Sequence, residues 1–465
     1  MLYINRQSNT PIYQQLYHAL KQDIISSPFK RMPLPAIRTL AKELCVSKNT
    51  VDQVYQQLLA EGYIYSVPGS GYFCNDIGRI QTPRAPISNV PEKPQAPLAR
   101  KPIRYNFEYG NLESRLFPWS KWRECIKEAL VTEEANPYLV YGDKQGDYRL
   151  REALSTVLHQ SRGVNCAPEQ IVICSGVHDT LRILAALLSP KEFILGFEEP
   201  GYSTARNIFM NNNYQIQPIS ITKQGISYDD LVKTNSNLVY LTPSHQFPTG
   251  YILPIASRNN ILTYINEKNG YVIEDDYDSE FRYKAMPIPS LQSLDVNDRV
   301  IYIGTFSKSF SPTIRVAYLV LPNRLLGTYQ TVCKDHKTPV AAIIQYALYL
   351  FINKGYYVRH IRKVVKASEK KYNRIISLFN EYSPHHIKPI TTESGVHLML
   401  EIESSLSEPE LLTYLEKNNI RLYPTGHYWL QPDNHPVTLQ MGFASMSMEE
   451  LENGVRHLFQ VFPKS

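Results

Sequence analysis

A proline-rich stretch divides this chain and limits how it can fold. Residues 81–103 carry six prolines and almost no apolar periodicity. Because proline blocks helix interiors and favours extended chain, residues 79–103 are predicted to form a semi-rigid linker. The linker separates a front part, residues 1–78, from a rear part, residues 104–465. A chain of 465 residues exceeds the roughly 250–300 that one core supports, so two domains are expected.

Composition and charge narrow the class of protein. With 43% hydrophobic and 20% charged residues the chain has a globular balance, and no apolar run approaches the roughly 20 residues that span a bilayer. The start lacks a signal-peptide pattern, and the six cysteines show neither a CxxC pair nor metal-ligand spacing. Reduced thiols in a cytoplasmic protein, without a metal site, are therefore expected. The net charge of +6 lies within residues 1–103, which suggests that the front end meets a polyanion.

The front part shows apolar residues at helical spacing, followed by short strand-like runs. One helix is predicted near residues 12–25, a second after Ala36, and a third with Ser47 as its N-cap. Two aromatic runs around a turn at residues 68–71 predict a hairpin. This order is typical of a winged helix-turn-helix, whose recognition helix presents its N-terminus to the major groove. The residues expected to contact double-stranded DNA are Arg38, Ser47, Lys48, Asn49, Thr50, Gly69 and Gly71.

A small helical cap or dimerisation module would show a similar helical pattern. The polar start of the third helix favours DNA binding instead. The front part resembles the GntR family of bacterial regulators, and the resemblance is carried by LPAIRTLAKELCVSKNTVDQVYQQLLAEGYIYSVPGSGYF. Ala36 stands where the family usually has a capping serine, and Lys48 replaces the usual arginine. Lysine keeps the charge but loses the bidentate fork, so a phosphate contact is expected at Lys48.

The rear part alternates buried-looking strands with helical stretches. Such apolar strands are typical of a largely parallel sheet with helices on both faces, and ligands bind beyond the carboxyl ends of its strands. Helices are predicted at residues 179–188 and 255–269. The predicted strands cover residues 171–174, 193–197, 238–241, 271–274, 301–305 and 317–321.

Reactive residue types follow two of these strands. Taken singly, a carboxylate there could cap a helix and a lysine could point to water. A lysine among apolar strand ends can instead lose its proton and form a Schiff base with an aldehyde, which is the expectation for Lys308. Asp275 could keep the ring nitrogen of pyridoxal phosphate protonated. Arg315 is close enough in sequence to bind the phosphate together with Thr305 and Ser307.

The rear part also resembles the fold-type I pyridoxal-phosphate aminotransferases through residues 104–450. The resemblance is carried by GTFSKSFSPTIRVAY, CSGVH, EEPGYSTAR and SHQFPTG, although His245-Gln246-Phe247 replaces the asparagine of the last motif. It implies that Tyr277 contacts the ring hydroxyl and that Tyr202 stacks on the ring. It also implies a phosphate-binding loop whose members are Ser175, Val177 and His178.

The combination of both parts resembles the MocR/GabR regulators, for which YGDKQGDYRLREAL and EDDYDSEFRY are typical wordings. The resemblance implies an α/β protein in which a winged helix-turn-helix precedes a fold-type I aminotransferase-like domain that binds pyridoxal phosphate. It implies a head-to-tail homodimer, with each cofactor site at the subunit interface and each winged helix over the partner. It further implies control of transcription through a small-molecule effector.

One position departs from the aminotransferase pattern. Gln440 stands where an arginine usually holds the substrate carboxylate, and an amide cannot form the charge-assisted pair. Arg206, Arg115 or Arg421 could compensate. Otherwise the effector is pyridoxal phosphate itself, or an amine bound without that carboxylate contact. A working aminotransferase with an accessory domain stays open as the second reading, and a structural protein with a vestigial cofactor site as the third.

Overall fold

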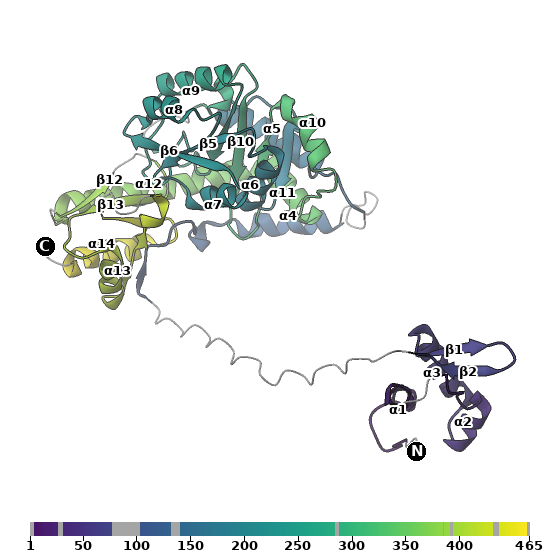
Figure 1. Ribbon diagram of the computed structural model, residues 1–465. Coiled ribbons are helices and arrows are strands. Elements are labelled where there is room, and N and C mark those ends of the chain that lie inside the picture. The colour runs from purple at the N-terminus through teal and green to yellow at the C-terminus, as the bar shows by residue number, and fades with distance from the viewer. Residues whose placement is uncertain are drawn as a thin grey trace. The chain divides into compact units, whose positions relative to one another are not determined.

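The computed structural model in Figure 1 divides the chain into two compact units, Met1–Arg100 and Lys101–Ser465. Nearly all of the predicted linker, up to residue 102, lies outside the described residues, so its proposed extent stays a prediction. The structure describes residues 4–26, 31–76, 103–131, 140–283, 288–384, 386–390, 394–430 and 437–462.

The first unit is a three-helix bundle followed by a hairpin, which confirms the predicted winged helix-turn-helix. Its elements are α1 (Ile12–Ser26), α2 (Ile37–Glu43), α3 (Lys48–Ala60), β1 (Ile64–Val67) and β2 (Gly71–Cys74). The helices share one apolar core because their buried residues recur at helical spacing. Its fully or almost fully buried members include Leu16, Leu40, Val51, Val54, Tyr55 and Leu58.

The starts of α2 and α3 differ in how their free N–H groups are satisfied. Ser47 caps α3 and accepts the Thr50 N–H at 3.0 Å, as its position in the sequence predicts. Ala36 precedes α2 and provides no side-chain acceptor. In the turn between β1 and β2, Gly69 and Gly71 have φ of 77° and 98°, a left-handed conformation that favours glycine.

The second unit is built on an eight-stranded, mostly parallel sheet, ordered β4-β11-β10-β9-β8-β5-β6-β7. Strand β11 is antiparallel to both neighbours, which the sequence did not indicate. Its connection to β10, residues 306–316, is shorter than the dozen or more residues that a parallel crossover needs. The strands are β4 (Ile171–Cys174), β5 (Ile194–Glu199), β6 (Gln215–Thr222), β7 (Gly225–Ile226), β8 (Leu238–Leu241), β9 (Tyr271–Asp276), β10 (Val300–Thr305) and β11 (Ala317–Val320).

Helices cover both faces of this sheet (Figure 1), because alternate strand residues point to opposite sides. Ile273 packs on the side of α6, α7 and α10, whereas Val272 packs on the side of α8 and α9. Helices α4, α5 and α11 cover the rest of this second face. The bounds are α4 (Trp119–Val131), α5 (Tyr148–Arg162), α6 (Val177–Leu187), α7 (Ser203–Asn211), α8 (Tyr228–Thr234), α9 (Ile255–Glu267), α10 (Asn323–Val332) and α11 (Ala342–Asn353).

The C-terminal part forms a smaller layer around its own apolar core. An antiparallel sheet, ordered β12-β13-β16-β15, packs there with α12, α13 and α14, and a short parallel pair joins β3 to β14. This layer brings β16, and with it Gln440, beside β13 and β15. The elements are α12 (Tyr356–Tyr382), α13 (Glu408–Lys417), α14 (Met448–Val461), β3 (Tyr105–Asn106), β12 (Ile387–Ile390), β13 (His397–Ile402), β14 (Ile420–Arg421), β15 (Tyr423–Pro424) and β16 (Thr438–Gly442).

Candidate functional site

A cavity of about 270 Å³ lies at the carboxyl ends of the parallel strands. Of the residues predicted to hold the cofactor, all except Ser175 line it: Lys308, Asp275, Tyr277, Tyr202, Thr305, Ser307, Arg315, Val177 and His178. Five further residues, none of which the sequence predicted to hold the cofactor, complete the lining: Tyr109, Thr242, Phe247, Pro312 and Tyr428. The residues gathered here come from segments far apart in the chain.

Lys308 follows β10 and is largely enclosed at the wall of this cavity. Its Nζ lies 3.9 Å from the centroid of the Tyr109 ring. A Cβ at Gly110 would lie 2.7 Å from Nζ, so glycine makes room for the amine. Burial lowers the pKa of Lys308 to about 8, although the nearby Asp278 and Asp275 act in the opposite direction. Near neutral pH, more of this amine is therefore in the neutral, nucleophilic form than in an exposed lysine.

Asp275 is the last residue but one of β9, and only half of its carboxylate is satisfied. Tyr240 donates its hydroxyl to one oxygen, while the other has no hydrogen-bond partner within the described residues. Burial, reinforced by the nearby Asp276 and Asp278, raises the pKa of Asp275 to about 7. A buried acceptor without a donor is unfavourable unless a ligand provides one. The protonated ring nitrogen of pyridoxal phosphate would provide both a donor and a positive charge, so Asp275 fits this cofactor.

The part of the cavity near Gly176 and Arg315 has the features of an anion site. Helix α6 begins after Gly176, and its N-terminus carries a partial positive charge. The Arg315 guanidinium lies 2.7 Å from the position that a Cβ would take on Gly176, which has φ of 80°. Arg315 itself has φ of 53°, a conformation uncommon outside glycine. These features fit the phosphate of the cofactor, with Ser307, whose N–H donates to Thr305 Oγ1 at 3.1 Å, beside it.

Ser175 does not take the place that the sequence suggested. Its backbone N–H donates to Asp179 Oδ2 at 2.8 Å, and Ser175 is not among the residues that line the cavity. His178 does line it, and its pKa is lowered by burial and by the cations Arg315 and Arg182. The imidazole is therefore expected to be neutral beside the phosphate site.

Tyr277 belongs to a buried hydrogen-bonded group that replaces the asparagine of the family motif. Its hydroxyl lies 2.9 Å from His245 Nδ1, which is also 2.8 Å from Asp278 Oδ2. Burial raises the pKa of Asp278, and His245 opposes this shift. His245 thus links the tyrosine expected at the ring hydroxyl to a second carboxylate, a role that the sequence alone did not indicate.

An aromatic wall faces the rest of the cavity. Phe247 is its centre and makes edge-to-face contacts with Tyr202, Tyr277 and Tyr428, at centroid distances of 5.6, 5.7 and 4.9 Å. Tyr109 lies 5.7 Å from the same ring. Tyr109 and Tyr428 carried no local motif that could have revealed them. Phe247 could be noticed only because SHQFPTG differs from the family motif at residues 245–247.

Gln440 lies one layer behind this wall. It is buried on β16 and accepts a hydrogen bond from the Tyr428 hydroxyl at 3.0 Å. Its Nε2 has no partner within the described parts of the chain, and Gln440 does not line the cavity. A contact from Gln440 to an effector, as predicted from its alignment, would have to be relayed by Tyr428.

The arginines considered as compensation lie elsewhere. Arg206 is buried on α7 and donates to the carbonyl groups of His427 and Tyr428 at 2.8 and 2.9 Å. Arg115 is exposed in a 3₁₀ turn, Ser114–Leu116. Neither residue lines the cavity, and Arg421 binds Glu416 at 2.8 Å. Among the described residues of the lining, Arg315 is the one arginine.

The expected DNA contacts gather at the start of α3. Ser47, Lys48 and Asn49 are exposed there, and Arg38 is exposed on α2.

The described ranges contain no helix long and apolar enough to cross a membrane. Over the same ranges, no group of three or more His, Cys, Asp or Glu side chains is arranged to hold a metal ion.

Comparison with known families follows the division into two units. Residues 108–458 match the aminotransferase class I and II family, and residues 12–74 match the bacterial regulatory proteins of the gntR family. The chain is therefore an aminotransferase-fold protein with a GntR-type DNA-binding domain. It belongs to the HTH-type transcriptional regulators of MocR type, which combine these two domains.

Curated relatives match along nearly the whole chain. An uncharacterized HTH-type transcriptional regulator, YdeL of Bacillus subtilis, is 36% identical over 98% of both chains. The probable rhizopine catabolism regulatory protein MocR of Rhizobium meliloti is 29% identical, covering 99% of this chain and 96% of its own. The pyridoxine biosynthesis transcriptional regulator PdxR of Corynebacterium glutamicum is 28% identical, covering 85% and 84%.

Solved structures agree on the fold of the second unit. A multiple substrate aminotransferase from Thermococcus profundus has a TM-score of 0.71 at 20% identity, covering 78% of this chain and 91% of its own. The α-aminoadipate aminotransferase LysN from Thermus thermophilus has a TM-score of 0.68 at 24% identity, covering 78% and 92%. At such identities the likeness establishes the fold alone.

Proposed function

We propose that this transcriptional regulator holds pyridoxal phosphate at Lys308 and couples the cofactor cavity to binding of double-stranded DNA. The observation that carries the proposal is the unpaired Asp275 oxygen in the cavity that contains the Lys308 amine. A buried carboxylate oxygen without a donor and a buried lysine with a lowered pKa are both unusual in a cavity that has only a structural role. The first suits the protonated ring nitrogen of the cofactor, and the second suits its aldehyde.

Pyridoxal phosphate supplies an aldehyde that condenses with an amine and a ring that withdraws electrons when its nitrogen is protonated. Asp275 would keep that nitrogen protonated, and Arg315 with the N-terminus of α6 would bind the phosphate. Tyr277 would donate to the ring hydroxyl, with its own orientation set by His245. The aromatic wall of the cavity would exclude water from the amine.

We infer that the effector is pyridoxal phosphate itself or an amine that needs no carboxylate clamp. Gln440 is shielded by Tyr428, and Arg206 already binds two backbone carbonyls. An α-amino acid would therefore bring its carboxylate to an aromatic wall without a matching cation. The relative named as a pyridoxine biosynthesis regulator is consistent with cofactor sensing.

The proposal includes a head-to-tail homodimer whose two winged helices bind promoter DNA. Lys48 and Arg38 would contact phosphates, and the N-terminus of α3 would enter the major groove. An effector would act by shifting the dimer between arrangements that differ in DNA affinity. Since the target is bacterial promoter DNA, the proposed location is the cytoplasm.

An active aminotransferase is the second candidate, and the cavity disfavours it. Transamination needs a firmly oriented carboxylate, and Arg315 at the phosphate end is the one arginine among the described lining residues. We expect at most residual turnover. Sustained exchange between an amino donor and a keto acid in a coupled assay would reverse this assignment.

Trapping the cofactor on the lysine tests the first half of the proposal. The purified chain is incubated with pyridoxal phosphate, reduced with borohydride, digested and analysed by mass spectrometry. The pyridoxyl adduct is expected on Lys308, and the Lys308→Ala variant is expected to lose it. An adduct spread over exposed lysines, unchanged in the variant, would contradict the assignment.

DNA binding tests the second half. Fluorescence anisotropy with a labelled fragment from upstream of the protein's own gene compares the apo and cofactor-loaded forms at one fixed salt concentration. A change in affinity on loading would identify the cofactor as the effector, whereas equal binding would direct the search to an amine. Absence of binding by both forms would favour the enzyme. Lys48→Ala provides a variant in which the cofactor adduct should persist while DNA affinity falls.

A further inference from the structure

A second cavity, of about 410 Å³, lies on the face of the sheet that α5 covers. It lies between the end of α5, the start of α12 and the ends of β9 and β10. Thr305 lines both this cavity and the one that contains Lys308. The wall of this second cavity combines apolar residues from α5 and α12 with tyrosines and charged groups. Such a mixture is usual for a small-molecule site.

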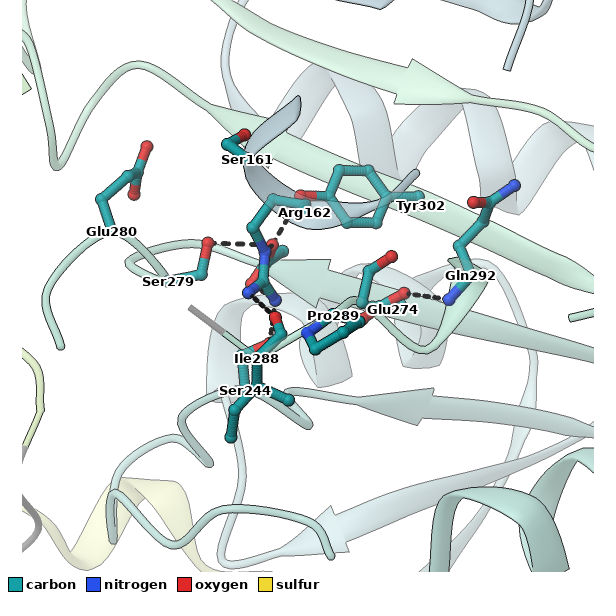
Figure 2. Close-up of polar contacts among 12 residues, drawn as sticks. Ser161, Arg162, Ser244, Glu274, Ser279, Glu280, Ile288, Pro289, Gln292 and Tyr302 are labelled. Carbon is teal, nitrogen blue, oxygen red and sulfur yellow. Dashed lines mark hydrogen bonds and ion pairs between the residues drawn. The ribbon is translucent and has the colours of Figure 1, made fainter. Parts of the chain in front are cut away.

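Two of the charged groups in this wall already satisfy one another. Arg162 Nε donates to Asp276 Oδ2 at 2.8 Å. The other nitrogens of Arg162 donate to Ser244 and to the Ile288 carbonyl, which are both labelled in Figure 2. Asp276 also accepts from Ser279 at 2.9 Å and from Tyr302 at 2.5 Å. The pair is thus electrically neutral and hydrogen-bonded on all sides, so it leaves little charge for a ligand.

Glu280 differs, because its carboxylate lacks a counter-charge. Figure 2 shows it pointing away from Arg162, with no contact to the other residues drawn. It accepts the Tyr357 hydroxyl at 3.3 Å, and no lysine, arginine or histidine forms an ion pair with it within the described residues. Burial, with Asp276 and Asp278 nearby, raises the pKa of Glu280 to about 7, although hydrogen bonds from its own backbone N–H and from Ser309 act in the opposite direction. An enclosed carboxylate of this kind is stabilised when a cation binds beside it.

Aromatic rings surround the same space. Tyr302, Tyr318 and Tyr357 all line the cavity. The faces of such rings attract alkylammonium groups, most strongly where water is excluded. Arg362 is the remaining basic residue of the lining, and it is exposed to solvent, which screens its charge.

We propose that this second cavity binds an organic cation, a protonated or quaternary amine, with Glu280 as the counter-charge and the tyrosine rings around the alkyl groups. This site is separate from the cofactor cavity and does not depend on the chemistry of Lys308. A ligand here would contact Thr305, which also lines the cavity that contains Lys308 and lies three residues before it in the chain. The proposal therefore adds a second ligand to the function argued above.

Choline is a suitable probe because it is a quaternary ammonium and cannot condense with pyridoxal phosphate. Calorimetric titration of the cofactor-loaded full chain is expected to show one saturable site for choline. The uncharged isostere 3,3-dimethylbutan-1-ol should bind at least about tenfold more weakly, since it lacks the charge that Glu280 compensates. Equal affinity for the alcohol, or no saturation at millimolar choline, would overturn the proposal.

Variants locate the site. Glu280→Gln is expected to weaken choline binding at least about tenfold, whereas Glu280→Asp, which keeps the charge, should retain most of it. Glu152→Gln, an exposed carboxylate on α5, is the matched control and should bind as the parent does. Attachment of the cofactor to Lys308 reports that each variant is folded. Parent-like choline binding by a folded Glu280→Gln variant would place the cation elsewhere and refute the site.

Discussion

Asp275 and Asp276 are neighbours at the end of β9, and their carboxylates have opposite surroundings. Asp276 is bound by Arg162, Ser279 and Tyr302, so its charge and its hydrogen bonds are satisfied by the chain. Asp275 receives one hydroxyl, from Tyr240, and keeps one oxygen unpaired on the cavity side. Because successive residues of a strand point to opposite faces of the sheet, the two carboxylates lie in different surroundings. The paired carboxylate of Asp276 stabilises the fold, whereas the unpaired oxygen of Asp275 is suited to bind a ligand.

The largest expected effect is on the free energy of unfolding, in a variant of Asp276. Asp276→Asn leaves the Arg162 guanidinium buried without a counter-charge, which should lower the free energy of unfolding by about 3–5 kcal/mol. Chemical denaturation of the apo protein, followed by fluorescence of the second unit, measures the loss. Asp275→Asn is the matched control on the same strand, and an equal loss in both variants would remove the distinction between the two carboxylates.

Asp275→Asn should act on the cofactor instead. We expect its affinity for pyridoxal phosphate to fall roughly tenfold to a hundredfold, because a neutral amide cannot hold the ring nitrogen protonated. Equilibrium titration followed by the visible absorbance of the bound cofactor measures this. The folded-state pKa of Asp275 is raised from 3.8 to about 7, so the parent binds more protons when folded and loses stability as pH rises through this window. At pH 8 the apo variant should therefore be no less stable than the parent.

A smaller effect should appear in the pH dependence of cofactor attachment. Only the neutral amine of Lys308 reacts, so the attachment rate should rise with pH through about 8 and then level off. Asp278 raises the pKa of Lys308, and its neutralisation in Asp278→Asn should move the midpoint to lower pH. Stopped-flow absorbance across the pH range measures the midpoint, and a shift to higher pH would contradict the electrostatic account.

The smallest effect extends the comparison to the first unit, where α3 has a cap and α2 has none. Ala36→Ser provides an acceptor for the free N–H groups of α2 and should stabilise this unit by about 1 kcal/mol. Thermal unfolding followed by circular dichroism is the measurement. Ser47→Ala, which removes the existing cap of α3, should destabilise by a similar amount, and the same sign for both variants would exclude capping as the cause.

Much of the fold could be predicted from the sequence, and so could the two residues with the most distinctive chemistry in the site, Lys308 and Asp275. Lys308 and Asp275 stand directly after apolar strand runs, and a strand end is a local feature that needs no tertiary information. Ser47 is similar, because a cap depends on the residues that follow it within one turn. The antiparallel direction of β11 was missed, since strand direction depends on how the connection closes rather than on the strand itself.

The rest of the site depends on contacts between distant segments. Tyr109 and Tyr428 face the same cavity from opposite ends of the second unit's sequence. Arg206 was considered for the effector, yet it binds backbone carbonyl groups, and no sequence pattern shows which arginine the fold has already engaged. The Arg162 network likewise requires loops at Ser244 and Ile288 that periodicity does not describe.

The pairing of β9 has a consequence for the kinds of genetic change that the protein tolerates. Asp275 is paired with Ile303 and Asp276 with Gly304 in the parallel ladder to β10. A single-residue insertion or deletion within β9 would shift this ladder by one position and exchange the two carboxylates between the faces of the sheet. A residue lost before Asp275 would bring Asp276 to the place of Asp275, whereas a residue gained there would bring Asp275 to the place of Asp276, beside Arg162. Substitutions can affect these two functions separately, whereas length changes in β9 must affect both together.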